Sequence, residues 1–196
     1  MESTFFDGNT YFIDEKVNMF KFENAYRLYD GEGKQLGNIN QKLTGGQKAL
    51  RLLLNKKMLP FLLEIRDEQG QLQATISRGW TFFMSKIVIA DATGTPVGQI
   101  KQKFTLLKPA FNIMDMAGIS LGYIKGDFVA WDFKITDAKN QPIGVVNKKW
   151  AGALKELFTT ADKYHVHISG ALEDKRTRIA IISAAVTIDM VLKESK

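Results

Sequence analysis

The alternation of apolar and polar residues predicts a protein built mainly from antiparallel strands. Short alternating segments recur along the chain, for example at residues 26–28, 63–65, 87–89, 111–113 and 133–135. A period of two residues is typical of a strand that buries one of its faces.

These segments are joined by a turn pattern, D-x-x-[G/N]-x-x-x-[G/A]-x-[I/V], that occurs five times. The copies begin at Asp30, Asp67, Asp91, Asp115 and Asp137. The Asp side chain can accept a hydrogen bond from the backbone two residues later, and the Gly or Asn supplies the positive φ of a bulged hairpin. The second small residue permits close packing or a bend of the strand. The repeat therefore predicts five β-hairpins.

Five hairpins supply ten strands, and residues 11–15, 18–22 and 164–168 add further strand candidates. About twelve antiparallel strands in one small domain imply closure, because open sheet edges invite aggregation. We therefore expect a mainly β, single-domain protein over residues 1–196, folded as a closed antiparallel barrel of about twelve strands. Twelve strands enclose a wider lumen than eight, and something must fill it.

The C-terminal segment is the candidate for filling this lumen. Residues 178–192 are apolar on nearly all sides, and a helix of that kind is buried. Its length of roughly 22 Å matches a barrel height of roughly 20 Å. We therefore expect a central apolar helix over residues 176–192, with Ala180, Ala184 and Ala185 allowing it to fit. The alternative is a membrane-inserted tail.

A second, shorter helix is expected at residues 151–160. Leu154, Leu157 and Phe158 have the spacing that places side chains on one helical face. This helix would interrupt the strands after the last hairpin.

Composition excludes several classes of function. Hydrophobic residues make up 45% of the chain, and there are two His. Because Cys is absent, disulfide scaffolds, thiolate metal sites and cysteine nucleophiles are excluded. His165 and His167 share a strand face without further ligands, so no metal or other cofactor is expected. No H-E-x-x-H or C-x-x-C motif occurs, and the chain is not expected to be an enzyme. The N-terminus lacks a secretory signal, so we expect a cytoplasmic protein, peripheral at membranes.

The positive charge is carried mostly by lysine. The chain has 21 Lys against 6 Arg and a formal net charge of +6. Lys acts as a mobile point charge for phosphate, whereas Arg is suited to reading base edges. The balance favours attraction to an anionic surface and argues against sequence-specific nucleic-acid binding.

Basic residues lie near the end of the second strand of each expected hairpin. They are Lys42, Arg78, Lys101, Lys103, Lys125, Lys148 and Lys149. If the hairpins are equivalent around the barrel, these residues gather toward one rim, where they would attract anionic lipid headgroups. The alternative is that they are solvated strand ends that protect against aggregation. Trp80, Trp131 and Trp150 are expected in the core. Residues 47–59, which mix Leu with Lys56 and Lys57, are expected to form a core strand or short helix with exposed ends, and entry into a membrane interface is the alternative.

Residues 149–166, from Lys149 and Trp150 to Tyr164 and Val166, resemble the corresponding stretch of the phospholipid scramblase family. The apolar C-terminal segment contains the tripeptide Ile188-Asp189-Met190, which resembles the same family. The hairpin repeats resemble that family and the plant LURP-one-related proteins. The resemblance implies a Tubby C-terminal-like fold, which is a twelve-stranded barrel around a central helix. It also implies binding of acidic phospholipid headgroups.

This chain departs from the animal members of the family in three features. Their Pro-rich arm and Cys-rich palmitoylation patch have no counterpart here, since the chain has 4 Pro and no Cys. Their proposed calcium segment begins with an acidic residue where this chain has Thr160. Calcium prefers six to eight oxygen ligands, and only Asp162, Glu173 and Asp174 are nearby, so calcium binding is not expected.

Together these features predict a non-enzymatic binding module for anionic phospholipid or phosphoinositide headgroups. The alternative is a regulatory or interaction protein that uses the barrel as a display scaffold without a lipid partner. The sequence identifies no protein partner. Movement of lipid across a bilayer is a weaker expectation, because an apolar helix inside the barrel leaves little surface to carry it.

Overall fold

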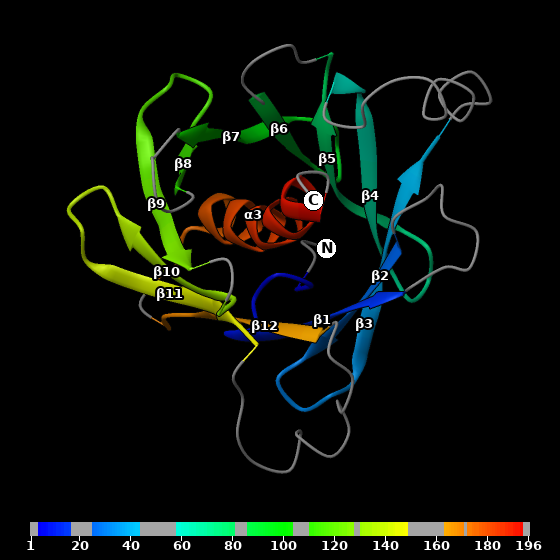
Figure 1. Cartoon of the computed structure of the whole chain (residues 1–196). Coiled ribbons are helices and arrows are strands. Elements are labelled where there is room, and N and C mark those ends of the chain that lie inside the picture. The colour runs from blue at the N-terminus through cyan, green and yellow to red at the C-terminus, as the bar shows by residue number, and fades with distance from the viewer. Residues whose placement is uncertain are drawn as a thin grey trace.

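A computed structural model describes residues 4–16, 25–43, 58–80, 86–103, 110–127, 130–148, 163–170 and 172–193. In these residues, twelve strands surround one helix (Figure 1). The elements are β1 (Thr10–Lys16), β2 (Ala25–Asp30), β3 (Gln35–Lys42), β4 (Phe61–Asp67), β5 (Leu72–Arg78), β6 (Lys86–Asp91), β7 (Pro96–Lys103), β8 (Ala110–Met114), β9 (Ser120–Asp127), β10 (Asp132–Asp137), β11 (Pro142–Asn147), β12 (Lys163–Ile168) and α3 (Lys175–Lys193).

Each strand pairs antiparallel with the next, and the sheet closes where β1 pairs with β12. Phe12 lies opposite His165 at this closing seam. The predicted closed barrel of about twelve strands is confirmed. The expected strand at 18–22, the short helix at 151–160 and residues 47–57 lie outside the described residues.

The five predicted turns have the chemistry that the repeat indicates. In the first, Asp30 Oδ1 accepts hydrogen bonds from the backbone N–H groups of Glu32 and Lys34, both at 2.9 Å. The fourth residue of each repeat has a positive φ, which is 85° at Gly33 and 63° at Asn140. The repeated Asp residues are therefore explained by turn structure.

The second small residue of the repeat lies where neighbouring strands come very close. At Gly122 in β9, an added Cβ would collide with the carbonyl oxygen of Thr136 in β10. On the other side of β9, the register with β8 shifts just after the pair of Ile113 and Gly122. Any side chain at position 122 would therefore push β9 and β10 apart.

Helix α3 lies inside the barrel, as Figure 1 shows, and its residues 177–191 are buried. It lies closest to β7, where a Cβ at Gly98 would be 3.5 Å from the Cβ of Ala180. Tyr26 reaches the helix from β2, and its hydroxyl donates to Asp189 Oδ2 at 3.1 Å. Small residues on β7 and a large aromatic side chain on β2 thus fill unequal gaps. Among the described residues, no helix is long and apolar enough to cross a bilayer.

The two ends of the barrel differ. We call the end that holds the five hairpin turns the turn end, and the end where one hairpin connects to the next the loop end. Helix α3 begins at the turn end, where Lys175 and Arg176 line a pocket together with Ala92 of the β6–β7 turn. It ends at the loop end, because Asp189 contacts Tyr26 near the start of β2.

Arg178 joins the start of α3 to the N-terminal segment. Its Nε donates to the carbonyl oxygen of Phe6 at 2.9 Å, Nη1 donates to that of Leu172 at 2.8 Å, and Nη2 donates to that of Gly8. The backbone N–H of Thr177 donates to Asp174 Oδ2 at 3.0 Å and so caps the helix. A buried guanidinium thus satisfies backbone carbonyls that would otherwise lack partners.

We predict that Arg178→Met lowers the free energy of unfolding by about 3 kcal/mol, because several buried carbonyl groups lose their donors. Urea unfolding measures this change. Arg176→Met, an exposed position on the same helix, is the control and should change stability by less than about 0.5 kcal/mol. Equal effects of the two substitutions would contradict the assigned role of Arg178.

Candidate functional site

The topology brings the ends of the second hairpin strands to the loop end. Since neighbouring strands are antiparallel, β3, β5, β7, β9 and β11 all run in the same direction. The predicted basic residues lie at or near these strand ends. The last residues of β3, β5 and β7 are Lys42, Arg78 and Lys103. Two residues before the ends of β7 and β9 lie Lys101 and Lys125, and Lys148 directly follows β11. Lys149 lies outside the described residues.

These residues do not all face the same way. Lys42, Lys101 and Lys125 alternate with buried neighbours and are exposed on the outer wall. Lys125 Nζ lies 5.6 Å from the centre of the Tyr123 ring, and Lys148 Nζ lies 4.9 Å from that of Trp131. The outer wall therefore carries at least three of the predicted cations.

Arg78 points into the barrel and is only 3% exposed. Its Nη2 donates to the carbonyl oxygen of Leu59 at 2.9 Å, and its guanidinium carbon lies 4.7 Å from the centre of the Phe61 ring. It lies on the inward face of β5 together with Ala74 and Ile76. The alternation of residues along this strand already predicts that orientation. Arg78 therefore supports the wall from inside and does not belong to an exposed surface.

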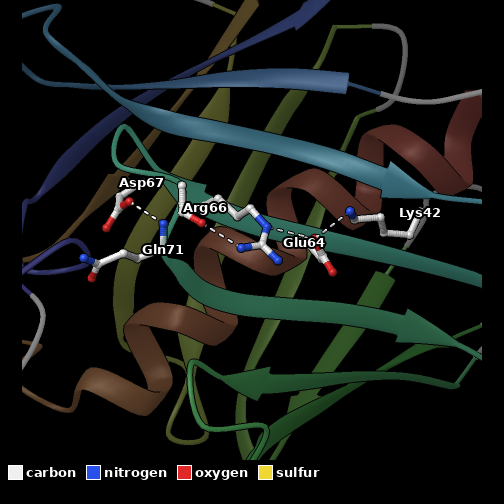
Figure 2. A network of polar contacts seen from close by, with 6 residues as sticks. Lys42, Glu64, Arg66, Asp67 and Gln71 are labelled. Atoms are coloured by element: carbon white, nitrogen blue, oxygen red, sulfur yellow. Dashed lines mark hydrogen bonds and ion pairs between the residues drawn. The ribbon is translucent and has the colours of Figure 1, made fainter.

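Lys42 is held in a polar network on β3 and β4 (Figure 2). Its Nζ lies 3.4 Å from Glu64 Oε2, and the Nε of Arg66 donates to the same oxygen at 2.9 Å. Nη1 of Arg66 also donates to the carbonyl oxygen of Gly70 at 2.7 Å. Burial raises the pKa of Glu64, but the hydrogen bond and charge of Arg66, followed by those of Lys42, outweigh it and lower that pKa below its ordinary value.

Strand register adds two lysines that sequence reasoning missed. Lys86 of β6 lies directly opposite Lys101, and Lys134 of β10 lies directly opposite Lys125. All four are exposed, and none of them forms an ion pair with a described residue. Like charges directly opposite each other on one sheet face are destabilising, since the Cβ atoms are only about 4.5–5.5 Å apart. Counting outward from the β6–β7 turn would have found the first pair, whereas the second pair joins two different hairpins and depends on how β9 pairs with β10.

The surroundings separate the two lysine pairs. Asp127 and Asp132 lie opposite each other two residues along from Lys125 and Lys134, so that pair has acidic neighbours on its own face.

The Lys86–Lys101 pair has a different setting. The neighbouring positions on its face of the described strands hold the uncharged Val88, Gln99 and Asn112 and a further lysine, Lys103, two residues along β7. Lys86 and Lys101 therefore form the less compensated positive centre on the wall.

An exposed aromatic side chain lies beside this centre. Trp80 follows β5 by two residues and is 54% exposed, and Leu62 on β4 is 37% exposed. Arg78 is opposite Ile87, so Trp80 lies at the loop end next to the start of β6. The prediction that Trp80 belongs to the core is wrong. Trp131 is partly buried against the core, and Trp150 lies outside the described residues.

The two histidines make separate polar contacts. Among the described residues, no three His, Asp or Glu side chains are grouped to hold an ion. His165 Nδ1 is 3.2 Å from the carbonyl oxygen of Asn147, while Nδ1 of His167 is 3.1 Å from Thr10 Oγ1. Burial lowers the pKa of His165, and the charge of His167 adds to this against the opposing effect of the Asn147 carbonyl.

The amino-acid sequence is similar to that of a known protein family and to several characterised proteins. The sequence model of the Scramblase family matches residues 13–195. Altered inheritance rate of mitochondria protein 25 from Saccharomyces cerevisiae is 26% identical over 171 residues, which make up 75% of this chain and 52% of that protein. Phospholipid scramblase 1 from Homo sapiens is 29% identical over 150 residues, or 69% of this chain and 47% of that protein.

A solved structure has the same fold. An X-ray structure of a protein from Arabidopsis thaliana superposes with a TM-score of 0.51 and covers 92% of this chain and 93% of that one, at 8% identity. At this identity the likeness concerns the fold alone. The chain spans about half the length of the curated relatives that it matches. The resemblance inferred from the C-terminal quarter is confirmed by the family match.

We predict that the pKa of Glu64 lies below the ordinary value of a glutamate and that Arg66→Met raises it. Because the pKa is lowered in the folded protein, the network stabilises the fold above the unfolded-state pKa, and this contribution disappears as the pH falls through the folded pKa. NMR titration of the Glu64 side chain measures both midpoints. A midpoint that does not respond to Arg66→Met would contradict the network in Figure 2.

Proposed function

Because the chain belongs to the scramblase family, we propose that it is a non-enzymatic module that binds anionic phospholipid headgroups. Several of its relatives carry the name phospholipid scramblase, which supports a lipid partner. The chain spans only about half of those proteins, so the proposal concerns binding and does not include movement of lipid across a bilayer.

The observation that carries the proposal is the exposed pair of Lys86 and Lys101 on the outer wall at the loop end. Two ammonium groups held side by side repel each other, and a phosphate group between them relieves that repulsion. An acidic membrane surface attracts each nearby cation by about 1 kcal/mol. The pair destabilises the folded protein unless an anion lies between the two ammonium groups. A role in binding anions therefore explains the pair better than a role in solubility.

The mechanism is electrostatic docking of the loop end on an acidic membrane, with no covalent step. Lys103 and Lys125, together with Lys148 and Lys149 after β11, are proposed as further contacts around this centre. Lys42 contributes less, because Glu64 already compensates its charge. Phosphatidylserine and phosphoinositide headgroups both fit this mode of binding, since both present phosphate to lysine. This mode of binding corresponds to a peripheral protein on the cytoplasmic face of a membrane.

A second candidate is a scaffold that displays a turn to a protein partner. Met116 and Ile119 in the β8–β9 turn are 46% and 65% exposed, at the end of the barrel opposite to the lysines. Exposed apolar side chains that lie close together can mark a protein interface. Their position separates this candidate from lipid binding, because each uses a different end of the barrel.

We predict that the protein sediments with phosphatidylserine-containing vesicles and not with pure phosphatidylcholine vesicles at the same salt concentration. The double substitution Lys86→Gln and Lys101→Gln should weaken this binding about thirtyfold, because each cation contributes about 1 kcal/mol. The same variant should be at least as stable as the parent protein, because a repulsive pair has been removed.

The control is the double substitution Lys34→Gln and Lys139→Gln, which removes the same charge from two exposed turns at the turn end. It should leave vesicle binding nearly unchanged. Equal recruitment to neutral and acidic vesicles, or equal losses in the two double variants, would count against the proposal.

A further inference from the structure

Two large apolar side chains are exposed close to the lysine centre. Trp80 and Leu62 lie at the loop end, on or next to the adjacent strands β5 and β4. Trp is usually well buried in folded proteins, so an exposed Trp that follows a regular strand is unusual. In this barrel the interior already holds many large side chains, among them Tyr26, Phe111 and Phe133.

The apolar residues lie between two cationic positions. Leu62 is directly opposite Lys42 in the β3–β4 register and opposite Ser77 in the β4–β5 register. On the other side, Trp80 lies next to the start of β6, where Lys86 faces Lys101 across to β7. From β3 to β7, the exposed residues of the loop end are thus Lys42, whose charge Glu64 compensates, then Leu62 and Trp80, and then the uncompensated Lys86 and Lys101.

This arrangement matches the chemistry of a membrane interface. An indole has an apolar body and one N–H donor, and it is favoured where hydrocarbon meets headgroups. Lysines beside it can lay their apolar stems along the surface while their ammonium groups remain with phosphate. A soluble anion would engage the lysines but would leave Trp80 and Leu62 exposed to water.

We infer that Trp80, supported by Leu62, enters the interface of an acidic bilayer while Lys86 and Lys101 bind its headgroups. The inference rests on the proposed function and adds the orientation of the barrel. The loop end faces the membrane and the turn end faces the solution. The exposed turn that holds Met116 and Ile119 is the competing contact, but its own charged residue is Asp115, which an acidic surface repels.

The test uses the full chain and vesicles of phosphatidylcholine and phosphatidylserine in equal parts, with the phosphatidylcholine brominated on its acyl chains. Bromine quenches the fluorescence of a Trp that reaches the hydrocarbon. We expect these vesicles to quench the unmodified protein more strongly than they quench the Trp80→Phe variant, which retains an apolar side chain. Quenching that is the same in both proteins would overturn the inference.

Affinity supplies a second measurement. Trp80→Gln should weaken binding to the same vesicles about tenfold, because the apolar contact of a large side chain is lost. The matched control is the double substitution Met116→Gln and Ile119→Gln, which should leave binding unchanged. If the control weakens binding and Trp80→Gln does not, the barrel docks by its turn end and the inference is wrong.

These outcomes distinguish the inference from the proposed function. Binding to acidic vesicles that depends on Lys86 and Lys101 but not on Trp80 retains the proposed function and overturns the insertion of Trp80. Absence of binding to acidic vesicles overturns both. Differential quenching together with a loss of affinity in Trp80→Gln supports both.

Discussion

The packing of α3 inside the barrel is the interaction on which the rest of the structure depends. A lumen enclosed by twelve strands is too wide for the side chains of the wall to fill. The helix supplies the missing apolar volume, with Ala180 against Gly98 on the near side and Tyr26 reaching Asp189 from the far side. Removing the helix would expose apolar surface on both the helix and the wall, which is strongly unfavourable.

The position of the helix also makes the two ends of the barrel different. At the turn end, the N-terminal segment is joined to the helix by the hydrogen bonds of Arg178, and five tight turns complete the rim. At the loop end, Lys86 and Lys101 lie on the outside of the wall, and Trp80 is exposed beyond the end of β5. The two ends therefore expose different residues, with Lys86, Lys101 and Trp80 at the loop end and the apolar Met116 and Ile119 at the turn end.

The lysine pairs show how a surface can carry a cost in stability that binding would offset. Lys125 and Lys134 have Asp127 and Asp132 beside them, so the local charge is balanced. Lys86 and Lys101 have no acidic neighbour among the described positions of their face, so their repulsion is not offset there. Functional sites are commonly where proteins retain such unfavourable contacts.

The amino-acid sequence by itself determined the strands, the five turns, the barrel closure and the central helix, because each follows from local chemistry or from a short repeat. The Asp30 turn and the apolar run of α3 need no distant partner to be recognised. Only the tertiary structure decided which cations are usable. Lys125 of one hairpin lies opposite Lys134 of the next, Glu64 of β4 compensates the charge of Lys42 on β3, and Trp80 is exposed. These facts depend on how distant segments pair, since register and facing are set by the closed sheet as a whole.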